Sequence, residues 1–395
     1  MRNRNVLLLL ALSHFCVDLY GSFLAPLQPF LISKHHLSLA QAGMLVSLLS
    51  VSASLLQPVY GFWADRLGRR VFVVLAPLLA GLFMSLLAVV SSFTSLAICL
   101  FMGGVGIASF HPQGSSISHA VSGSRKGLGL SLFISGGNFG TSVGPLYIMF
   151  LVNRLGLDST YAAAVPGILL CFALFLFCPP VERRHSPVSV KSLFSGLKQY
   201  AAPLSSLYFI VVFRTFVQLC FLTYIPILLR DFNYSPLLLG ATLTCFTGFG
   251  AVGGLTGGYL YDRLGGRNLF LFSSMVAPIF LLLTSQSHDP FFMMLFFALG
   301  GFFLMMTIPI SVLMGQTIVP DAISTVSSLM MGFGWGMAGL MVPLAGTLAD
   351  RTSIPLALGL LCMIPWLYIP LAWRLPKSVG VASQRADISQ PVVEI

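Results

Sequence analysis

His14 and Asp18 stand four residues apart in a long apolar segment near the start of the sequence. In a helix this spacing places both side chains on one face, where an imidazole can contact a carboxylate. Histidine changes its charge near neutral pH, and a carboxylate beside it can receive or deliver the proton. The pair therefore predicts a proton relay, with Asp18 as the proton carrier and His14 as its partner. A packing histidine with an ordinary hydrogen bond is the alternative for His14.

Four other side chains in apolar segments could contact a polar substrate. Arg214 carries a permanent charge on a planar guanidinium that suits an anionic group, and Gln218 stands four residues later on the same predicted face. His111 precedes a proline, which bends a helix and frees a carbonyl. Asn138 lies among glycines, where an interhelical hydrogen bond is an equally good interpretation. We expect substrate contacts at Arg214, Gln218, His111 and Asn138.

The sequence shows no constellation for covalent or cofactor chemistry. The glycine-rich stretch 248–258 lacks the lysine of a phosphate-binding loop. The seven cysteines form no CxxC pair, so neither a metal site nor a disulfide framework is indicated. We therefore expect no enzymatic activity, no cofactor and no metal. Any energy that the protein uses would then come from an ion gradient.

The composition indicates which elements hold these side chains. Only 8% of the 395 residues are charged and 56% are apolar, so the solvent must be largely lipid. A membrane-spanning helix needs about 20 mainly apolar residues. Twelve such segments lie near 5–32, 41–64, 71–92, 94–119, 128–153, 160–179, 203–229, 236–261, 268–285, 289–317, 322–349 and 354–374. Asp18 and Arg214 lie near the middle of theirs, where a charge is costly and normally serves a pathway.

The basic residues alternate between successive connections. One side holds 16 of the 21, namely Arg2, Arg4, Arg66, Arg69, Arg70, Arg125, Lys126, Arg183, Arg184, Lys191, Lys198, Arg263, Arg267, Arg374, Lys377 and Arg385. By the positive-inside rule this side is cytoplasmic, which predicts a multi-pass protein of the inner (cytoplasmic) membrane with both termini in the cytoplasm. The net charge of +10 then indicates contact with the lipid surface and no nucleic-acid partner.

An internal repeat divides the chain. Residues 61–70 and 258–267 both fit GxxxDRxGxR and stand 197 residues apart, as do Pro29 and Pro226. Each copy of the repeat contains six of the predicted segments. Because six is an even number, both copies enter the membrane in the same orientation. We expect an all-α integral membrane protein of twelve transmembrane helices, in two six-helix bundles related by a pseudo-two-fold axis along the membrane normal. The bundles would span 1–179 and 203–374, with a cytoplasmic interdomain loop at 180–202 and a cytoplasmic tail at 375–395.

The repeated hairpin resembles the signature of the major facilitator superfamily of secondary transporters. The resemblance implies a cytoplasmic gate latch formed by Gly61, Asp65, Arg66, Arg69, Arg70, Gly258, Asp262, Arg263 and Arg267. It also implies that helices one, four, seven and ten line a central cavity, which puts Asp18 and Arg214 on opposite walls. A static ion pair that clamps the two halves is the alternative for these two residues.

A closer resemblance is to the fosmidomycin-resistance proteins, which are bacterial drug efflux transporters. It rests on Ser13-His14 with Asp18, on Phe110-His111-Pro112, and on residues 56–61 and 136–145. Two departures stand beside it. Gln113 occupies a position where those proteins commonly carry a glutamate, and only the Gly140, Gly144 and Pro145 core of the superfamily's antiporter motif is present.

The resemblance implies a monomeric exporter of a small organic molecule, driven by protons through alternating access. The charges alone favour another direction. An anion at Arg214 would raise the proton affinity of Asp18, and such cooperation suits proton-coupled uptake of an organic anion. A third possibility is a receptor that has kept the fold without transporting, because fold alone does not fix function. We expect export of a small molecule, with anions among the candidate substrates and protons as the coupling ion.

Overall fold

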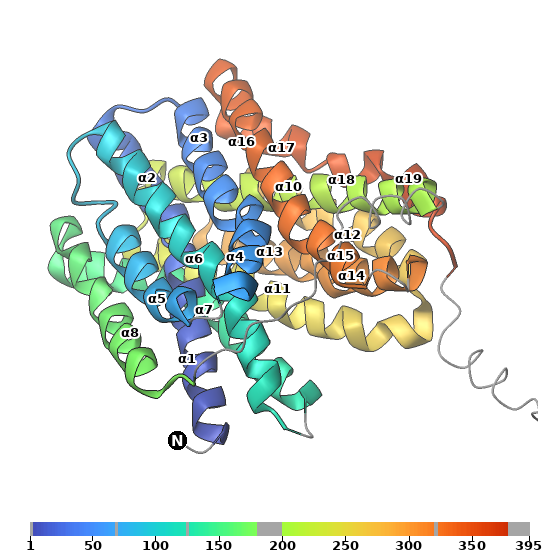
Figure 1. Ribbon diagram of the computed structural model, residues 1–395. Helices are drawn as coiled ribbons and strands as arrows, with labels where there is room; N and C mark the ends of the chain where they lie inside the picture. The colour runs from blue at the N-terminus through green and yellow to red at the C-terminus, as the bar shows by residue number, and fades with distance from the viewer. Residues whose placement is uncertain (1–2, 68–69, 124–125, 180–199, 320–322, 378–395) are drawn as a thin grey trace, which may run out of the picture.

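The computed structural model describes residues 3–67, 70–123, 126–179, 200–319 and 323–377 (Figure 1). Every element in these ranges is helical. Residues 180–199 of the expected interdomain loop and 378–395 of the expected tail lie outside the described ranges.

The helices before residue 180 run in chain order as α1 (Asn3–Gly21), α2 (Leu24–His35), α3 (Leu39–Ser50), the π-helix η1 (Val51–Leu55), α4 (Gln57–Leu67), α5 (Val71–Ser85), α6 (Phe93–Val121), α7 (Lys126–Leu155), the 3₁₀-helix η2 (Leu157–Ala164) and α8 (Val165–Phe177). The first expected segment is thus two helices separated at Ser22 and Phe23, and the second is three consecutive helical pieces.

After residue 199 the helices are α10 (Ala201–Asp231), α11 (Pro236–Leu264), α12 (Gly266–Gln286), α13 (Pro290–Met305), α14 (Thr307–Ile318), α15 (Ile323–Ser328), the π-helix η5 (Leu329–Phe333), α16 (Gly334–Arg351), α17 (Ile354–Leu361), α18 (Ile364–Leu367) and α19 (Ile369–Trp373). In the described chain, ten helical stretches are long and apolar enough to cross a membrane, and α5 is a shorter apolar helix.

Many of these helices begin where the sequence offers a cap. Ser38 and Ser92 each form a capping box with the residue three positions later, and Ser235 caps a helix whose first residue is Pro236. Such caps satisfy amide groups that have no partner inside the helix. The polar connections therefore fix where the apolar helices start.

Glycines bring α1 and α7 together, and these helices carry much of the candidate site. A side chain at Gly136 would meet the carbonyl group of Ala11, and one at Gly140 would meet that of Phe15. The absence of side chains allows the two backbones to touch, as is common between membrane helices. The polar face of α1 is held against α7 as a result.

The most extensive contacts between the described residues before 180 and those after 199 are made by helix pairs. They are α3 with α16, α7 with α11, and α2 with α10. In Figure 1, α3 and α16 lie side by side at the top of the view. These pairs hold the described residues before 180 against those after 199.

Candidate functional site

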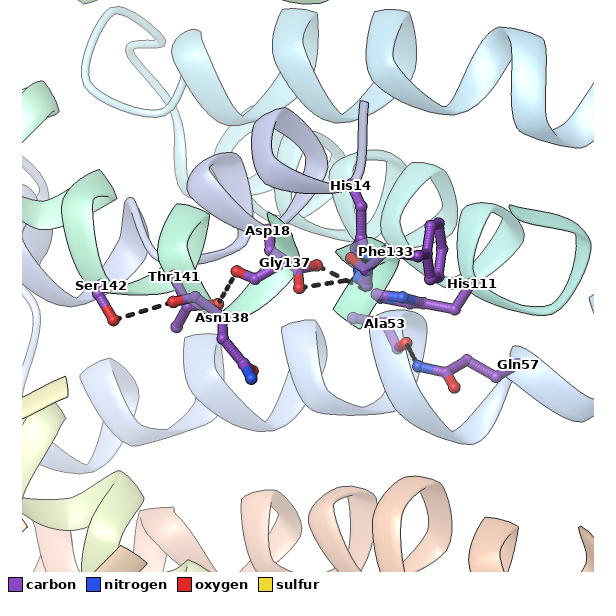
Figure 2. Close-up of polar contacts among 10 residues, drawn as sticks. All are labelled: His14, Asp18, Ala53, Gln57, His111, Phe133, Gly137, Asn138, Thr141 and Ser142. Carbon is purple, nitrogen blue, oxygen red and sulfur yellow. Dashed lines mark hydrogen bonds and ion pairs between the residues drawn. The ribbon is translucent and has the colours of Figure 1, made fainter. Parts of the chain in front are cut away.

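His14 and Asp18 of α1 and His111 of α6 form one cluster (Figure 2). Nε2 of His14 lies 3.2 Å from Oδ2 of Asp18, and Nε2 of His111 lies 3.5 Å from Oδ1. These are the ion pairs found among the described residues. His14 is buried, whereas the side chains of Asp18 and His111 keep 19% and 25% of their exposure. The carboxylate is therefore shared by two imidazoles and is not fully sealed.

The second ring nitrogen of His14 determines the protonation of the pair. Nδ1 lies 2.8 Å from the carbonyl oxygen of Phe133 in α7. A carbonyl only accepts, so Nδ1 must carry the hydrogen. In a neutral His14 the lone pair of Nε2 would then face the carboxylate of Asp18, and two acceptors would oppose each other. The arrangement is favourable only when a cation, such as one further proton, is shared between His14 and Asp18.

Aromatic rings and a glycine fix the position of His14. Its ring stacks on Phe133 with centroids 4.2 Å apart and lies 5.6 Å from the ring of Phe110. A Cβ on Gly137 would approach both Nε2 of His14 and Oδ2 of Asp18 to 2.5 Å. The cluster therefore occupies space that any other residue at position 137 would fill.

The same three residues could also hold a metal ion. One ligand atom from each of His14, Asp18 and His111 lies within 4.8 Å of the others. Imidazole nitrogens and a carboxylate oxygen suit a divalent transition metal. The geometry thus fits either a shared proton or a metal ion, and experiment must distinguish them.

Asn138 lies on an exposed part of α7, one residue after Gly137. Its backbone carbonyl accepts a hydrogen bond from Ser142 at 2.9 Å. Gln57 of α4 donates to the carbonyl of Ala53 at 2.9 Å. Figure 2 shows Asn138 on α7 and Gln57 on α4, with the amide of Gln57 bonded to the carbonyl of Ala53.

Gln113 has a structural role in the folded chain. Its Oε1 accepts the backbone N–H of Val73 at 2.8 Å, and the side chain is buried. It thereby ties α6 to the first turn of α5. This use of the amide agrees with a position that does not require an acid.

Arg214 of α10 is buried, with 1% of its surface exposed. It takes part in neither of the two ion pairs of Asp18. Its Nη2 donates to Oγ1 of Thr215 at 3.0 Å, while Nε and Nη1 have no hydrogen-bond partner among the described residues. It interacts electrostatically with Tyr368, at the junction of α18 and α19. Gln218, one turn further along α10, is buried, and its Oε1 also has no hydrogen-bond partner within the described chain.

The hairpin residues are described in part. The Asp65, Arg66 and Arg69 side chains lie outside the described ones. Arg70 donates to the carbonyl of Phe175 at 2.8 Å. In the second copy Asp262 is exposed, Arg263 lies over the ring of Tyr259 and Arg267 over that of Trp373, and Gly258 stands beside Pro309.

Comparison with known proteins matches this architecture to one family. The profile of the Major Facilitator Superfamily matches residues 10–343 and 204–394. The chain belongs to the major facilitator superfamily. It is therefore a multi-pass membrane protein with the family and fold of a transporter and not of an enzyme.

Relatives within the superfamily include resistance proteins. The fosmidomycin resistance protein of Escherichia coli K12 is 28% identical over 368 residues, covering 91% of this chain and 89% of the relative. Multidrug resistance protein 1 of Bacillus subtilis 168 is 22% identical over 403 residues, covering 97% of this chain and 100% of the relative. These relatives confirm the resemblance drawn from the motifs.

A solved structure shows the same fold. A bacterial homologue of the human lysosomal transporter Spinster, in an inward-facing and occupied conformation, superposes with a TM-score of 0.78. It is 15% identical, and the match covers 100% of this chain and 99% of that one.

The sequence did not reveal that His111 would join the pair on α1. Position 111 was interpreted as a substrate contact, because no spacing rule relates residues on α1 and α6. Phe133 and Gly137 were also missed as determinants of the cluster. The only available signal was the glycine-rich run of α7, which is typical of close helix approach.

Proposed function

We propose that the protein is a proton-coupled secondary transporter that exports a small organic molecule by alternating access. The observation that carries the proposal is the hydrogen bond from Nδ1 of His14 to Phe133, because it leaves Nε2 facing Asp18 with room for one shared proton. A group that takes up and releases a proton inside the membrane is the minimum that coupling requires.

Partial exposure allows the cluster to exchange its proton as access alternates. The side chains of Asp18 and His111 remain partly exposed, whereas His14 is anchored and buried. We assign the proton to Asp18 and His14, with His111 as a second imidazole that stabilises the carboxylate when the proton leaves. A substrate that bonds to Asp18 would then compete with the proton. A transporter that exports its substrate while protons enter requires that proton and substrate compete in this way.

The position of Arg214 supports export over the cooperative scheme for uptake. That scheme needs Arg214 to act directly on Asp18, and the carboxylate is instead paired with two histidines. Without that contact, an anion at Arg214 has no direct reason to tighten proton binding.

Proton-coupled uptake of an organic anion remains the second candidate, because one observation favours an anionic substrate. Nε and Nη1 of Arg214 are buried without hydrogen-bond partners in the described chain. A buried unpaired guanidinium is costly, and an anionic group would satisfy it. Arg214→Ala should abolish transport of an anion and Arg214→Lys should weaken it, while Arg230→Ala on the same helix serves as control. The direction of transport under an imposed pH gradient separates the two candidates.

The proposed architecture is a monomer of twelve transmembrane helices in two six-helix bundles, 1–179 and 203–374. The loop 180–202 and both termini would be cytoplasmic, in the inner membrane, because the basic connections lie on that side. An epitope placed after Lys191 should resist external protease in right-side-out vesicles. Cleavage from outside would reverse the orientation.

The decisive experiment compares two kinds of transport in proteoliposomes. Asp18→Asn keeps the size of the side chain but cannot titrate, so it should still catalyse substrate counterflow and fail to drive substrate against its gradient. Asp158→Asn, at an exposed position in η2 outside the cluster, is the control and should retain both. Full gradient-driven accumulation by Asp18→Asn would remove Asp18 from the coupling mechanism.

A further inference from the structure

The end of α16 carries the same spacing as the repeated hairpin. Gly346, Asp350 and Arg351 fit GxxxDR, as do residues 61–66 and 258–263. This third copy does not follow the 197-residue repeat. The two hairpins lie on the side rich in basic residues. The third copy lies on the opposite side, which is poor in basic residues and which we expect to be external.

The carboxylate of Asp350 binds the start of α3 across the two parts of the molecule. Its Oδ1 accepts the backbone N–H of Leu39 and its Oδ2 that of Ala40, both at 2.9 Å. Ser38 accepts the N–H of Gln41. The first three amides of α3 are thus all satisfied, two of them by a side chain more than 300 residues away. A carboxylate at a helix N-terminus also gains from the helix dipole.

The backbones around this contact lie unusually close. A Cβ on Gly43 of α3 would come within 2.8 Å of Cα of Pro343 in α16. Ser47 of α3 donates to the carbonyl of Gly339 at 2.8 Å. Tyr224 of α10 donates from one hydroxyl toward the carbonyls of Leu39 and Val342, at 3.3 and 3.2 Å. Hydrogen bonds from three helices therefore close this end.

The equivalent junction, between α7 and α11, has no matching carboxylate cap in the described chain. The repeat relates Leu39 to Pro236, which has no N–H to donate, and Asp350 to Asn153, which has no charge. There α11 starts with its own cap at Ser235. One of the two pseudo-symmetric junctions thus carries a charged latch that the other does not.

We propose that Asp350 is a positioning residue for alternating access, which holds the external end closed by capping α3. For that end to open, the carboxylate must leave the amides of Leu39 and Ala40. This inference rests on the proposed transport function. Its test needs neither substrate nor gradient, so failure of the latch is distinguishable from failure of transport.

Cys220 is a native reporter for opening. It is fully buried on α10, one turn before Tyr224 on the same face. In right-side-out vesicles, a membrane-impermeant maleimide should label Cys220 slowly, with the modified residue identified by mass spectrometry. Asp350→Asn should accelerate this labelling about five-fold, the size expected for losing a charged helix cap.

Two further variants make the test decisive. Leu39→Pro removes one amide donor at the first helical position, which tolerates proline and where the repeat already has Pro236; it should also accelerate labelling. Asp289→Asn removes a carboxylate that caps α13 within its own part of the chain, and it should leave the rate unchanged. Unchanged labelling of folded Asp350→Asn, or equal acceleration by Asp289→Asn, would overturn the latch. If Asp350→Asn does not fold, Leu39→Pro decides alone.

Discussion

At the scale of single residues, the two nitrogens of His14 have different tasks, and a substitution can separate them. Nδ1 binds the carbonyl of Phe133, and Nε2 faces Asp18. In His14→Asn the amide nitrogen stands close to the place of Nδ1, so the anchor can persist, but nothing titrates toward Asp18. We expect gradient-driven accumulation to fall about ten-fold, which corresponds to about 1.4 kcal/mol, while counterflow is retained.

The matched control for that variant is His119→Gln. His119 is also a histidine of the membrane helices, but it is exposed near the end of α6. Its substitution should change neither transport mode. Equal losses in both variants would mean that His14 acts through general stability and not through the shared proton.

A second test at the residue scale asks whether His14, Asp18 and His111 hold a shared proton or a metal ion. If a proton is sufficient, gradient-driven transport by purified protein should survive exhaustive chelation. Transport that stops on chelation and returns with added Zn²⁺ or Co²⁺ would assign the cluster to a metal. Co²⁺ is informative because its visible absorption reports nitrogen and oxygen ligands directly.

At the scale of helices, the glycines of α7 set the distance between α1 and the cluster. Gly137→Ala adds one methyl group that would lie 2.5 Å from both His14 and Asp18. Overpacking of this kind typically costs about 1–3 kcal/mol and moves the neighbours. We expect Gly137→Ala to impair gradient-driven transport more than counterflow.

Gly248 of α11 provides the control, since a Cβ there would meet nothing within 4 Å. Gly248→Ala should therefore leave both transport modes and thermal stability unchanged. Normal coupling in Gly137→Ala would show that α7 tolerates a side chain at this point and that the packing of α1 does not control the cluster.

The helices also show how far the sequence leads. Apolar length predicted segments such as 203–229 and 236–261 close to α10 and α11, and the i, i+4 rule predicted the contact of His14 with Asp18. Neither apolar length nor the i, i+4 rule predicts contacts between helices that are distant in the sequence. Neither the approach of His111 to Asp18 nor the cap that Asp350 places on α3 follows from periodicity, because both depend on how separate helices pack.

Three interruptions of the expected segments were also missed for a local reason. The breaks at Ser22 and Phe23 and the π-helical stretches η1 and η5 lie within continuous apolar sequence. Hydropathy does not distinguish an α-helical turn from a π-helical one. Such turns are often found at functional sites. Here η1 directly follows α3, η5 directly precedes α16, and the two stretches contact each other.

At the scale of the whole molecule, alternating access requires that each end can be held closed and released. The family resemblance predicts one latch at the cytoplasmic hairpin with Asp65, and we propose a second at Asp350, which accepts the amides of Leu39 and Ala40. The two act on opposite states. Loss of Asp65 should favour closure of the external end, whereas loss of Asp350 should favour its opening.

The last prediction therefore concerns the two substitutions together. Asp65→Asn alone should slow external labelling of Cys220, and Asp350→Asn alone should accelerate it. Because position 65 is expected at the cytoplasmic side and Asp350 at the external side, their free-energy effects should add to within about 0.5 kcal/mol. The double variant should then label at the rate given by the product of the two separate fold changes, which is slower than the rate of Asp350→Asn alone. Labelling as fast as in Asp350→Asn alone would show that Asp65 does not bias the same equilibrium, and the cytoplasmic latch would have to be sought in the second copy, at Asp262.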